Sequence, residues 1–273
     1  MAIKDILAVV DAGSQDDQFV KDALALAEFH GASLTVLVTS ALPMADYTLT
    51  VASPYVMLQD DTEAVEAKRA RIGKLASGAN VEVRAISDQP AMIFAKASIH
   101  ARYADVVLFG PADSFEYPHI RRETMESILF SSGRPVLVIP TGHRPGTIQH
   151  LALGWNATRE ATLALRSAME FAAPGAMIDV LVMDAKSSAE GHGSEPGADI
   201  ARHLARHGFN ATVVPVQSGN LPDAEALIKA TRETGADFLS IGAYGHSRLR
   251  QMILGGVTRD LLSEAPIPLL FSH

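Results

Sequence analysis

The feature that most constrains the fold is an order of strand-like and helix-like segments that runs through the chain twice. Each half contains five apolar runs of the length of a buried strand. In the first half these runs are Ile3–Val10, Ser33–Thr39, Val81–Ile86, Ala104–Phe109 and Pro135–Ile139. In the second half they are His150–Trp155, Ile178–Met183, Ala211–Val216, Ala236–Ile241 and Pro268–Ser272. The chain therefore predicts two copies of one fold.

Helical patterns separate the strand-like runs in the same order in both halves. They span Asp16–His30, Asp60–Ala76, Gln89–Arg102 and Ile120–Ser131, and then Arg159–Ala172, Asp199–His207, Pro222–Thr234 and Thr258–Glu264. Short phrases repeat at matching places, such as Ala104-Asp105-Val106 and Ala236-Asp237-Phe238. We therefore expect one domain at residues 1–142 and another at 147–273, joined by a short linker rich in Gly and Pro.

Continuous apolar strands that alternate with helices are typical of a parallel sheet covered on both faces. Crossovers between parallel strands are right-handed, which leaves a doubly wound arrangement as the main solution. The sequence therefore predicts an α/β protein with two doubly wound, Rossmann-like domains in tandem, each with a five-stranded parallel sheet. In such sheets ligands bind at the carboxyl ends of the strands, where the strand order reverses. A site is expected in the turns after the first and fourth strands of each half.

The composition excludes several classes of function. The 31 acidic and 23 basic residues give a formal net charge of -8, which disfavours sequence-independent binding to nucleic acid or to an anionic membrane. The chain has no cysteine, so disulfides, thiolate metal sites and cysteine nucleophiles are ruled out. No apolar stretch approaches the ~20 residues of a membrane span, and the first residues show no export signal. We expect a soluble cytoplasmic protein.

A glycine-rich segment follows the fourth strand of the second half, from Gly242 to Thr258. Glycines at 242, 245, 255 and 256 flank a segment that carries His246, Arg248 and Arg250. Glycine lets backbone N–H groups approach an anion closely, and a helix N-terminus adds free N–H groups and a partial positive charge. This combination suits a polyphosphate. Ordinary turn and cap glycines are the alternative, and the residues alone leave both interpretations open.

The spacing of these glycines resembles the universal stress protein family, and the order of elements in each half resembles one domain of that family. Members that bind ATP carry Gly-x-x-Gly, nine residues, and then Gly-Ser or Gly-Thr. Here Gly242 and Gly245 match, nine residues follow, and Gly255 matches. The chain departs at the next position, where Gly256 replaces the hydroxyl residue, and Thr258 follows two residues later. The resemblance implies a stress-response or regulatory protein that binds ATP or ADP, with or without Mg²⁺, in its second half.

The resemblance also implies which residues hold the nucleotide. The set comprises Asn156, Met183, Gly242, Gly245, Gly255, Gly256, Val257 and Thr258. Asn156 follows the first strand of this half, where the family usually carries Asp, and it can donate and accept hydrogen bonds toward a ribose or an adenine edge. Capping the following helix is an equally good role for Asn156. Met183 would contribute only its backbone.

The first half has lost the corresponding loop. When the halves are aligned, Gly110 keeps the first glycine position, but the other three positions carry Asp113, Arg122 and Glu123. Acidic side chains at these places repel a polyphosphate. We therefore expect a degenerate first domain that binds no nucleotide, beside a competent second domain.

Motifs for familiar catalytic sites are missing from the sequence. There is no GxxxxGK[ST] loop, and Gly-x-Gly-x-x-Gly follows neither first strand. His203 and His207 are four residues apart, but no Glu lies between them as in H-E-x-x-H, so we expect no metal site. The sequence offers no convincing general base aimed at a bound phosphate. We expect no enzyme activity beyond slow ATP hydrolysis, which positioning and charge alone can support.

Three functions stay open. The main prediction is a nucleotide-binding regulatory module, and the alternative is an interaction scaffold of the same fold that binds no nucleotide. The third is an enzyme of the wider adenine nucleotide α-hydrolase-like group, such as an adenylating ligase, against which the missing SGGxDS-type loop counts. The resemblance further implies that the last strands, Val136–Ile139 and Leu269–Ser272, pair the two halves as an intramolecular pseudo-dimer. The protein partner is unknown, and a homodimer is left open.

Overall fold

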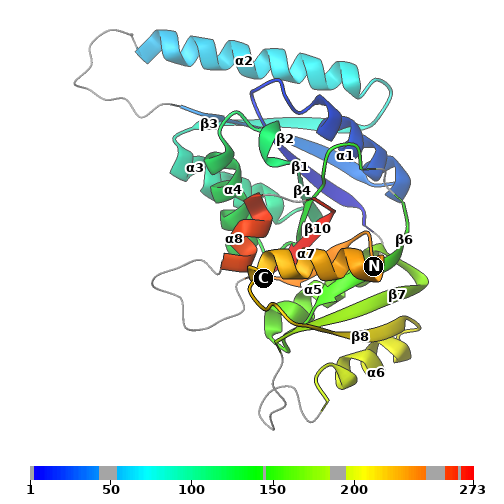
Figure 1. Cartoon of the computed structure of the whole chain (residues 1–273). Coiled ribbons are helices and arrows are strands. Elements are labelled where there is room, and N and C mark those ends of the chain that lie inside the picture. Colours follow the sequence, from blue (N-terminus) through cyan, green and yellow to red (C-terminus); the bar gives the residue numbers. More distant parts are fainter. Residues whose placement is uncertain (1–2, 43–53, 144–145, 185–194, 244–255, 264–265) are drawn as a thin grey trace. The chain divides into compact units, whose positions relative to one another are not determined.

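The structure is a computed structural model of the whole chain, which describes residues 3–42, 54–143, 146–184, 195–243, 256–263 and 266–273. The chain forms two compact units, Ala2–Pro145 and Gly146–His273, and each is considered by itself (Figure 1). The predicted domain limits, 1–142 and 147–273, remain a proposal about where independently folding domains begin and end.

The first unit alternates strands with helices along its sequence. Its strands are β1 (Asp5–Asp11), β2 (Ser33–Ala41), β3 (Val81–Asp88), β4 (Val106–Phe109) and β5 (Val136–Val138). Its helices are α1 (Asp17–His30), α2 (Pro54–Leu75), α3 (Pro90–Ala101), the short 3₁₀ helix η1 (Ala112–Ser114) and α4 (Pro118–Ser131). Neighbouring strands run parallel, in the order β3-β2-β1-β4-β5.

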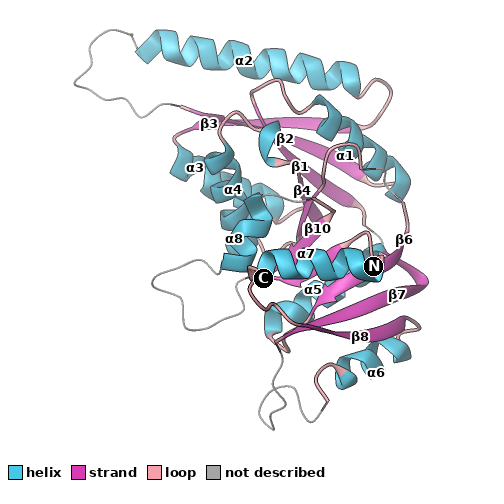
Figure 2. Ribbon diagram, in the orientation of Figure 1, coloured by secondary structure: helices cyan, strands magenta, loops and turns pink. Residues whose placement is uncertain are grey.

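The second unit repeats this arrangement. Its strands are β6 (Ile148–Gly154), β7 (Ala172–Met183), β8 (Asn210–Val216), β9 (Leu239–Gly242) and β10 (Leu269–Ser272). Its helices are α5 (Arg159–Phe171), α6 (Ala198–Arg206), α7 (Asp223–Thr234) and α8 (Gly256–Ser263). These strands are also parallel, in the order β8-β7-β6-β9-β10 (Figure 2). The predicted fold class, a doubly wound, five-stranded parallel sheet in each half, is confirmed.

The central strands are buried because helices cover both faces of each sheet. In the first unit α1 packs on α2 and α3 packs on α4, and right-handed crossovers put these pairs on opposite faces. Ala8, Val9 and Val10 of β1 are fully buried, as are Leu151 and Leu153 of β6. Such continuous apolar runs are what a sheet covered on both faces requires. Within the described ranges, no helix is long and apolar enough to cross a membrane.

Some element limits differ from those expected from the sequence. Helix α2 begins at Pro54 instead of Asp60, and proline suits the first turn of a helix. Strand β7 begins at Ala172, directly after α5, instead of at Ile178. The added part contains Gly175, with a φ of +77°, which interrupts the apolar pattern used for the prediction. Helix α8 begins at Gly256, before the expected start.

Candidate functional site

In the second unit the strand order reverses between β6 and β9. The chain runs from β6 through β7 to β8, and then returns to β9 on the other side of β6. Gly154 at the end of β6 pairs with Ile241 near the end of β9. The carboxyl ends of these strands therefore flank the crevice where doubly wound sheets bind ligands. Asn156 follows β6 and Gly242 ends β9, so the structure brings these two predicted residues to the same edge.

The other predicted residues of the glycine-rich segment fall in two groups. Gly245 and Gly255 lie outside the residues that the structure describes. Gly256, Val257 and Thr258 form the first turn of α8. Thr258 is 4% exposed, so it is buried at this point of the helix.

Asn156 shapes the turn between β6 and α5. Its Oδ1 accepts hydrogen bonds from the Thr158 backbone N–H at 3.3 Å and from the Thr158 hydroxyl at 2.8 Å. Thr158 is the N-cap of α5, and its Oγ1 accepts from the Ala161 N–H at 3.3 Å. The Nδ2 group of Asn156 makes no hydrogen bond to any described residue, and the residue is exposed. The Asn156 oxygen therefore stabilises the turn, while its Nδ2 group has no hydrogen-bond partner among the described residues.

Gly242 has a steric role at the end of β9. A Cβ at this position would lie 2.5 Å from the Ala161 nitrogen and 2.5 Å from the Glu160 carbonyl carbon. Both are backbone atoms in the first turn of α5, so only glycine lets this helix approach the strand. The close packing holds the N-terminus of α5 at the crevice. Among the described residues, no group accepts from the backbone N–H groups of Arg159 and Glu160.

Met183 ends β7, the strand on the other side of β6, and its side chain is half-buried. The residue after it, Asp184, has a φ of +45° and donates its N–H to the Val216 carbonyl at 2.9 Å. The Asp184 carboxylate accepts from the Ser218 N–H at 3.2 Å and from the Ser218 hydroxyl. Asp184 and Ser218 therefore tie together the ends of β7 and β8. The sequence pattern did not indicate this pair, although an Asp directly after a strand is a typical turn residue.

Asp11 occupies the equivalent edge of the first unit, at the end of β1. Its Oδ1 accepts from the Gly13 N–H at 2.9 Å, and its Oδ2 accepts from the Glu116 N–H at 2.6 Å. Burial raises the pKa of the Asp11 carboxyl above its ordinary value, and the bonds from Glu116 and Gly13 oppose that rise. Asp11 therefore joins the loop after β1 to the loop after β4 across the switch point of this sheet.

Lys68 of α2 reaches the same edge from the side. Its side chain is 2% exposed, and its Nζ donates to the Gly13 carbonyl at 2.5 Å and forms an ion pair with Asp16. The Oδ2 atom of Asp16 is buried and has no hydrogen-bond partner among the described residues. Burial raises the pKa of Asp16, and the hydrogen bond from Lys68 opposes the rise. A cation of the chain itself thus fills the space beside the β1 turn.

Arg121 of α4 covers the end of β4. Its side chain is buried, and its Nε and Nη2 donate to the Gly110 carbonyl at 2.9 Å and 2.7 Å. Burial lowers the pKa of Arg121 to about 10, with Asp113 acting in the opposite direction. A Cβ on Gly110 would come within 2.7 Å of the Ser114 Oγ. The strand end that corresponds to Gly242 is therefore occupied by a side chain of the protein.

The loss of the first-half site was expected from acidic side chains at the glycine positions, and in the structure Lys68 and Arg121 also occupy this edge. Lys68 and Arg121 were missed as residues of this edge. The signal was present, since Val65, Lys68 and Ile72 share the helical spacing of one buried face. No group of three His, Asp or Glu residues suited to a metal ion occurs in the part of the chain that the structure describes.

Comparison with known proteins places the clearest similarity in the second unit. Residues 152–273 match the model of the universal stress protein family. A segment of 46 residues is 37% identical to Universal stress protein Slr1230 of Synechocystis sp.. That alignment covers 17% of this chain and 16% of the Synechocystis protein, so it spans a small part of both.

Similarity to solved structures extends over both units. A universal stress protein from Archaeoglobus fulgidus aligns with a TM-score of 0.69 and 13% identity, over 97% of this chain and 95% of that chain. The Pseudomonas aeruginosa protein PA1789, described as functionally unknown, aligns with a TM-score of 0.53 and 13% identity, over 99% and 92% of the two chains. At these identities the alignments show a shared tandem fold.

Proposed function

Because residues 152–273 belong to the universal stress protein family, we propose that the second half of this chain binds an adenine nucleotide, ATP or ADP. On this proposal the protein is a nucleotide-responsive regulator, with hydrolysis slow or absent. The first half contributes no second nucleotide site, because Lys68 and Arg121 fill its edge.

The observation that carries the proposal is the place of the glycine-rich segment in the fold. The chain leaves β9 at Gly242, beside the switch point between β6 and β9, and enters α8 at Gly256. A loop that connects these two points begins at the edge where doubly wound sheets bind ligands. Its sequence supplies Gly245, Gly255 and basic residues at the family's spacing. Backbone N–H groups of such a loop suit a chain of phosphates.

The described residues at this edge fit a nucleotide. The Arg159 and Glu160 N–H groups, in the first turn of α5, have no acceptor among the described residues and lie at the positive end of the helix. The Nδ2 group of Asn156 is a further donor, toward a ribose or an adenine edge. We propose that Met183 offers its backbone at the end of β7, and that Val257 and Thr258 position the start of α8 behind the phosphates.

The described carboxylates at this edge do not suit a dedicated Mg²⁺ site. Asp184 is bonded to Ser218, and Glu160 is paired with Arg159 at 3.7 Å. A metal ion that accompanies ATP would be held mainly by the phosphates.

The experiment is to denature freshly purified full-length protein and to identify released nucleotide by chromatography and mass spectrometry. Titration calorimetry with ATP, ADP, GTP and inorganic tripolyphosphate then separates recognition of the base from recognition of the phosphates. We expect ATP and ADP to bind more tightly than GTP and tripolyphosphate. If neither ATP nor ADP binds at millimolar concentration, the proposal fails.

The alternative is an interaction scaffold that binds no nucleotide, and two observations favour it. Gly242 is explained by its contact with α5, without any ligand, and the Asn156 carbonyl is explained by the turn that it caps. On that alternative, the titrations give no heat with any of the four compounds.

A further inference from the structure

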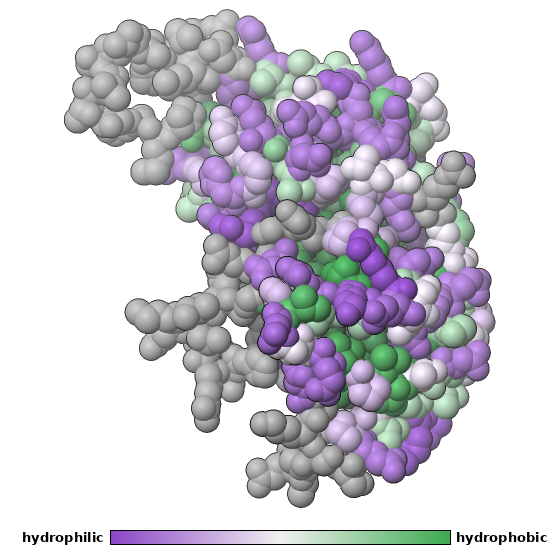
Figure 3. All heavy atoms as spheres, in the orientation of Figure 1, coloured by the Kyte–Doolittle hydropathy of each residue, from purple (hydrophilic) through white to green (hydrophobic). Residues whose placement is uncertain are grey.

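A groove runs between α7 and α8 within the second unit. Its volume is about 980 Å³, and its apolar lining consists of Pro222, Ala224, Ile228, Leu261 and Pro266. Ala224 and Leu261 are buried at its base, and Ile228 is half-buried. On the face that carries α7, hydrophobic residues are exposed beside polar ones (Figure 3). Its α8 side is formed by Asp260 and Leu261, which follow the first turn of the helix that the proposed nucleotide site uses.

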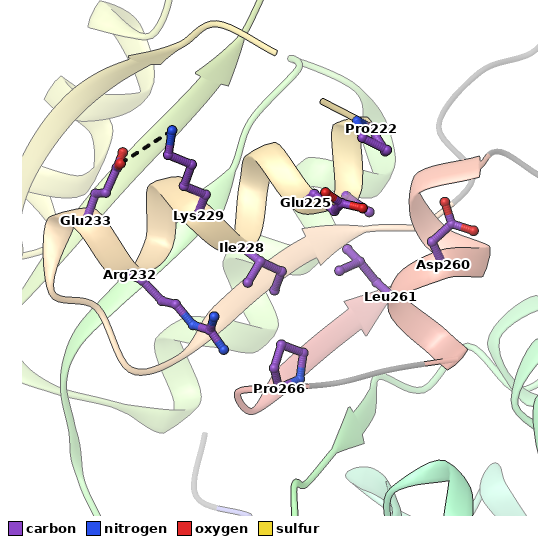
Figure 4. Close-up of a pocket in the computed structure, with 10 residues that line it drawn as sticks. Pro222, Glu225, Ile228, Lys229, Arg232, Glu233, Asp260, Leu261 and Pro266 are labelled. Carbon is purple, nitrogen blue, oxygen red and sulfur yellow. Dashed lines mark ion pairs between the residues drawn. The ribbon is translucent and has the colours of Figure 1, made fainter. Parts of the chain in front are cut away.

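The two ends of the groove carry opposite charges. Glu225 and Asp260 lie at one end, Arg232 lies at the other, and Ile228 and Leu261 lie between them (Figure 4). The side chains of Glu225, Asp260 and Arg232 form no ion pair or hydrogen bond with any other described residue. In contrast, Lys229 at the side of the groove forms an ion pair with Glu233 at 3.7 Å. The groove therefore has an exposed acidic end, an apolar middle and an exposed basic end.

The corresponding helices of the first unit, α3 and α4, also pack on each other, as α7 and α8 do. The Ser98 and Ser127 hydroxyls lie 3.0 Å apart, and the Ser127 hydroxyl donates to the Phe94 carbonyl at 3.1 Å.

The charges at the two ends of the groove indicate which kind of helix would fit it. Glu225 and Arg232 are seven residues apart on one helix, which is roughly 10 Å along its axis, and Ile228 lies near the midpoint. A convex helix that fits this groove needs a basic group opposite Glu225, an apolar group opposite Ile228 and an acidic group opposite Arg232. Helix α7 of a second copy supplies these groups when it lies antiparallel: its Arg232 faces Glu225, its Ile228 faces Ile228, and its Glu225 faces Arg232.

We propose that two copies of this chain pair through these grooves. Helix α7 of each copy lies in the α7–α8 groove of the other, antiparallel, about a two-fold axis near Ile228. Glu225 of each copy then faces Arg232 of the other, and the two Ile228 side chains meet. A two-fold axis makes each contact twice, so a self-complementary charge pair is counted twice in the interface.

Sedimentation velocity on the full chain measures whether particles have the mass of one chain or of two. We expect the wild type to pair at micromolar concentration, and high salt to weaken the pairing. Glu225→Arg brings two pairs of guanidinium groups together, and Arg232→Glu brings two pairs of carboxylates together. Each reversal should raise the dissociation constant about tenfold or more. Arg206→Glu on α6 makes the same charge change on an exposed residue outside the groove and should leave pairing unchanged.

Mixing the two reversed variants gives the decisive measurement. In a mixed pair, Arg at position 225 of one copy faces Glu at position 232 of the other, and the native Arg232 faces the native Glu225. Each variant alone should therefore remain a single chain at concentrations where an equal mixture forms pairs. Circular dichroism checks that both are folded. If a reversal does not fold, Glu225→Gln and Arg232→Gln remove both contacts without repulsion and should weaken pairing severalfold.

Three results would each overturn the proposal. One is a wild type with the mass of one chain at every concentration, which is also what a groove for a helix of another protein gives. The second is pairing of the single variants as strong as that of the wild type, because the interface then lies elsewhere. The third is a mixture of folded variants that does not pair.

Discussion

Asp11 and Asn156 follow the first strand of their respective units, and they use their side-chain oxygens differently. Both carboxylate oxygens of Asp11 accept hydrogen bonds from backbone N–H groups of two loops, at Gly13 and Glu116. Asn156 uses its oxygen on Thr158 alone and keeps a donor without a described partner. The first arrangement closes an edge of the sheet, and the second leaves a group for a ligand.

Asn156→Ala should lower both stability and ATP affinity. It removes the acceptor for Thr158, at a cost of about 0.5–1.5 kcal/mol in the free energy of unfolding, and it also removes the Nδ2 donor. Asn156→Asp keeps the acceptor for Thr158 but replaces the Nδ2 donor with a carboxylate oxygen, so stability should be retained while ATP affinity falls. Urea unfolding and ATP titration measure the two effects. The control is Thr158→Ala, which removes the cap of α5, worth about 1 kcal/mol, and leaves the ligand contact in place. An Asn156→Ala protein that binds ATP like the wild type would limit Asn156 to capping.

The glycines of the loop should divide into a structural one and ligand-contacting ones. Gly242→Ala forces a Cβ against the backbone of α5, so we expect a loss of about 1–3 kcal/mol in unfolding free energy even without nucleotide. Gly245→Asp should leave stability unchanged and weaken ATP binding by at least ~10²-fold, because two or three charge-assisted hydrogen bonds are lost at about 1.5–3 kcal/mol each. Thermal unfolding without ligand and calorimetry with ATP distinguish the two. Equal ATP affinity in a folded Gly245→Asp protein would move the phosphates elsewhere.

At the scale of elements, α2 is fastened to the start of α1 by two ion pairs of different character. Lys68–Asp16 is buried, whereas Arg71–Asp17 is largely exposed. A buried pair costs much to break on one side only, because the remaining charge stays without a partner. An exposed pair contributes little. The buried contact is therefore the one that fixes α2 over the edge of the first unit.

Lys68→Met should destabilise the protein by about 3–5 kcal/mol at neutral pH, since Asp16 is then left charged and buried. The loss should shrink as the pH falls toward 3.8, the ordinary pKa of an Asp. Burial already raises the pKa of Asp16, and removing Lys68 raises it further. A carboxyl with a raised folded-state pKa contributes stability that is present at low pH and lost as the pH rises through that pKa. Urea unfolding at neutral and mildly acidic pH measures the effect, with Arg71→Met as the control on the same helix. A pH-independent loss would contradict the assignment to Asp16.

The sequence predicted the elements well and the contacts of polar residues less well. Continuous apolar runs identified every strand within the described residues, because both faces of each sheet are buried. The extension of β7 to Ala172 was missed, since Pro174 and Gly175 interrupt the apolar pattern. Lys68 and Arg121 were missed because their partners are backbone carbonyls or residues far along the chain, at Gly13, Asp16 and Gly110. Spacing in a sequence does not record such long-range contacts.

At the scale of the whole molecule, the two units share one fold and differ at the edge where that fold binds ligands. The occupied edge of the first unit and the open donors of the second predict one nucleotide per chain. The implied pairing of Val136–Ile139 with Leu269–Ser272 remains a prediction about how the halves meet.

Titration of ATP into the full chain should therefore give a stoichiometry of one. Gly245→Asp in the same chain should remove all of the binding heat, instead of half of it. Active-protein concentration is the control, checked by a second titration with ADP. A stoichiometry of two, or half of the heat remaining in Gly245→Asp, would show that the first half binds as well.

Lys68 and Arg121 can also be viewed as ligands that are part of the chain. A dissolved ligand occupies its site to a degree set by its concentration, whereas a covalently attached one leaves only when the helix that carries it unfolds. The occupancy of the first unit's edge is therefore constant in the folded protein. On the proposed function, the second unit fills and empties as nucleotide levels change. The first half then stays in one state, and only the occupancy of the second half changes with the concentration of nucleotide.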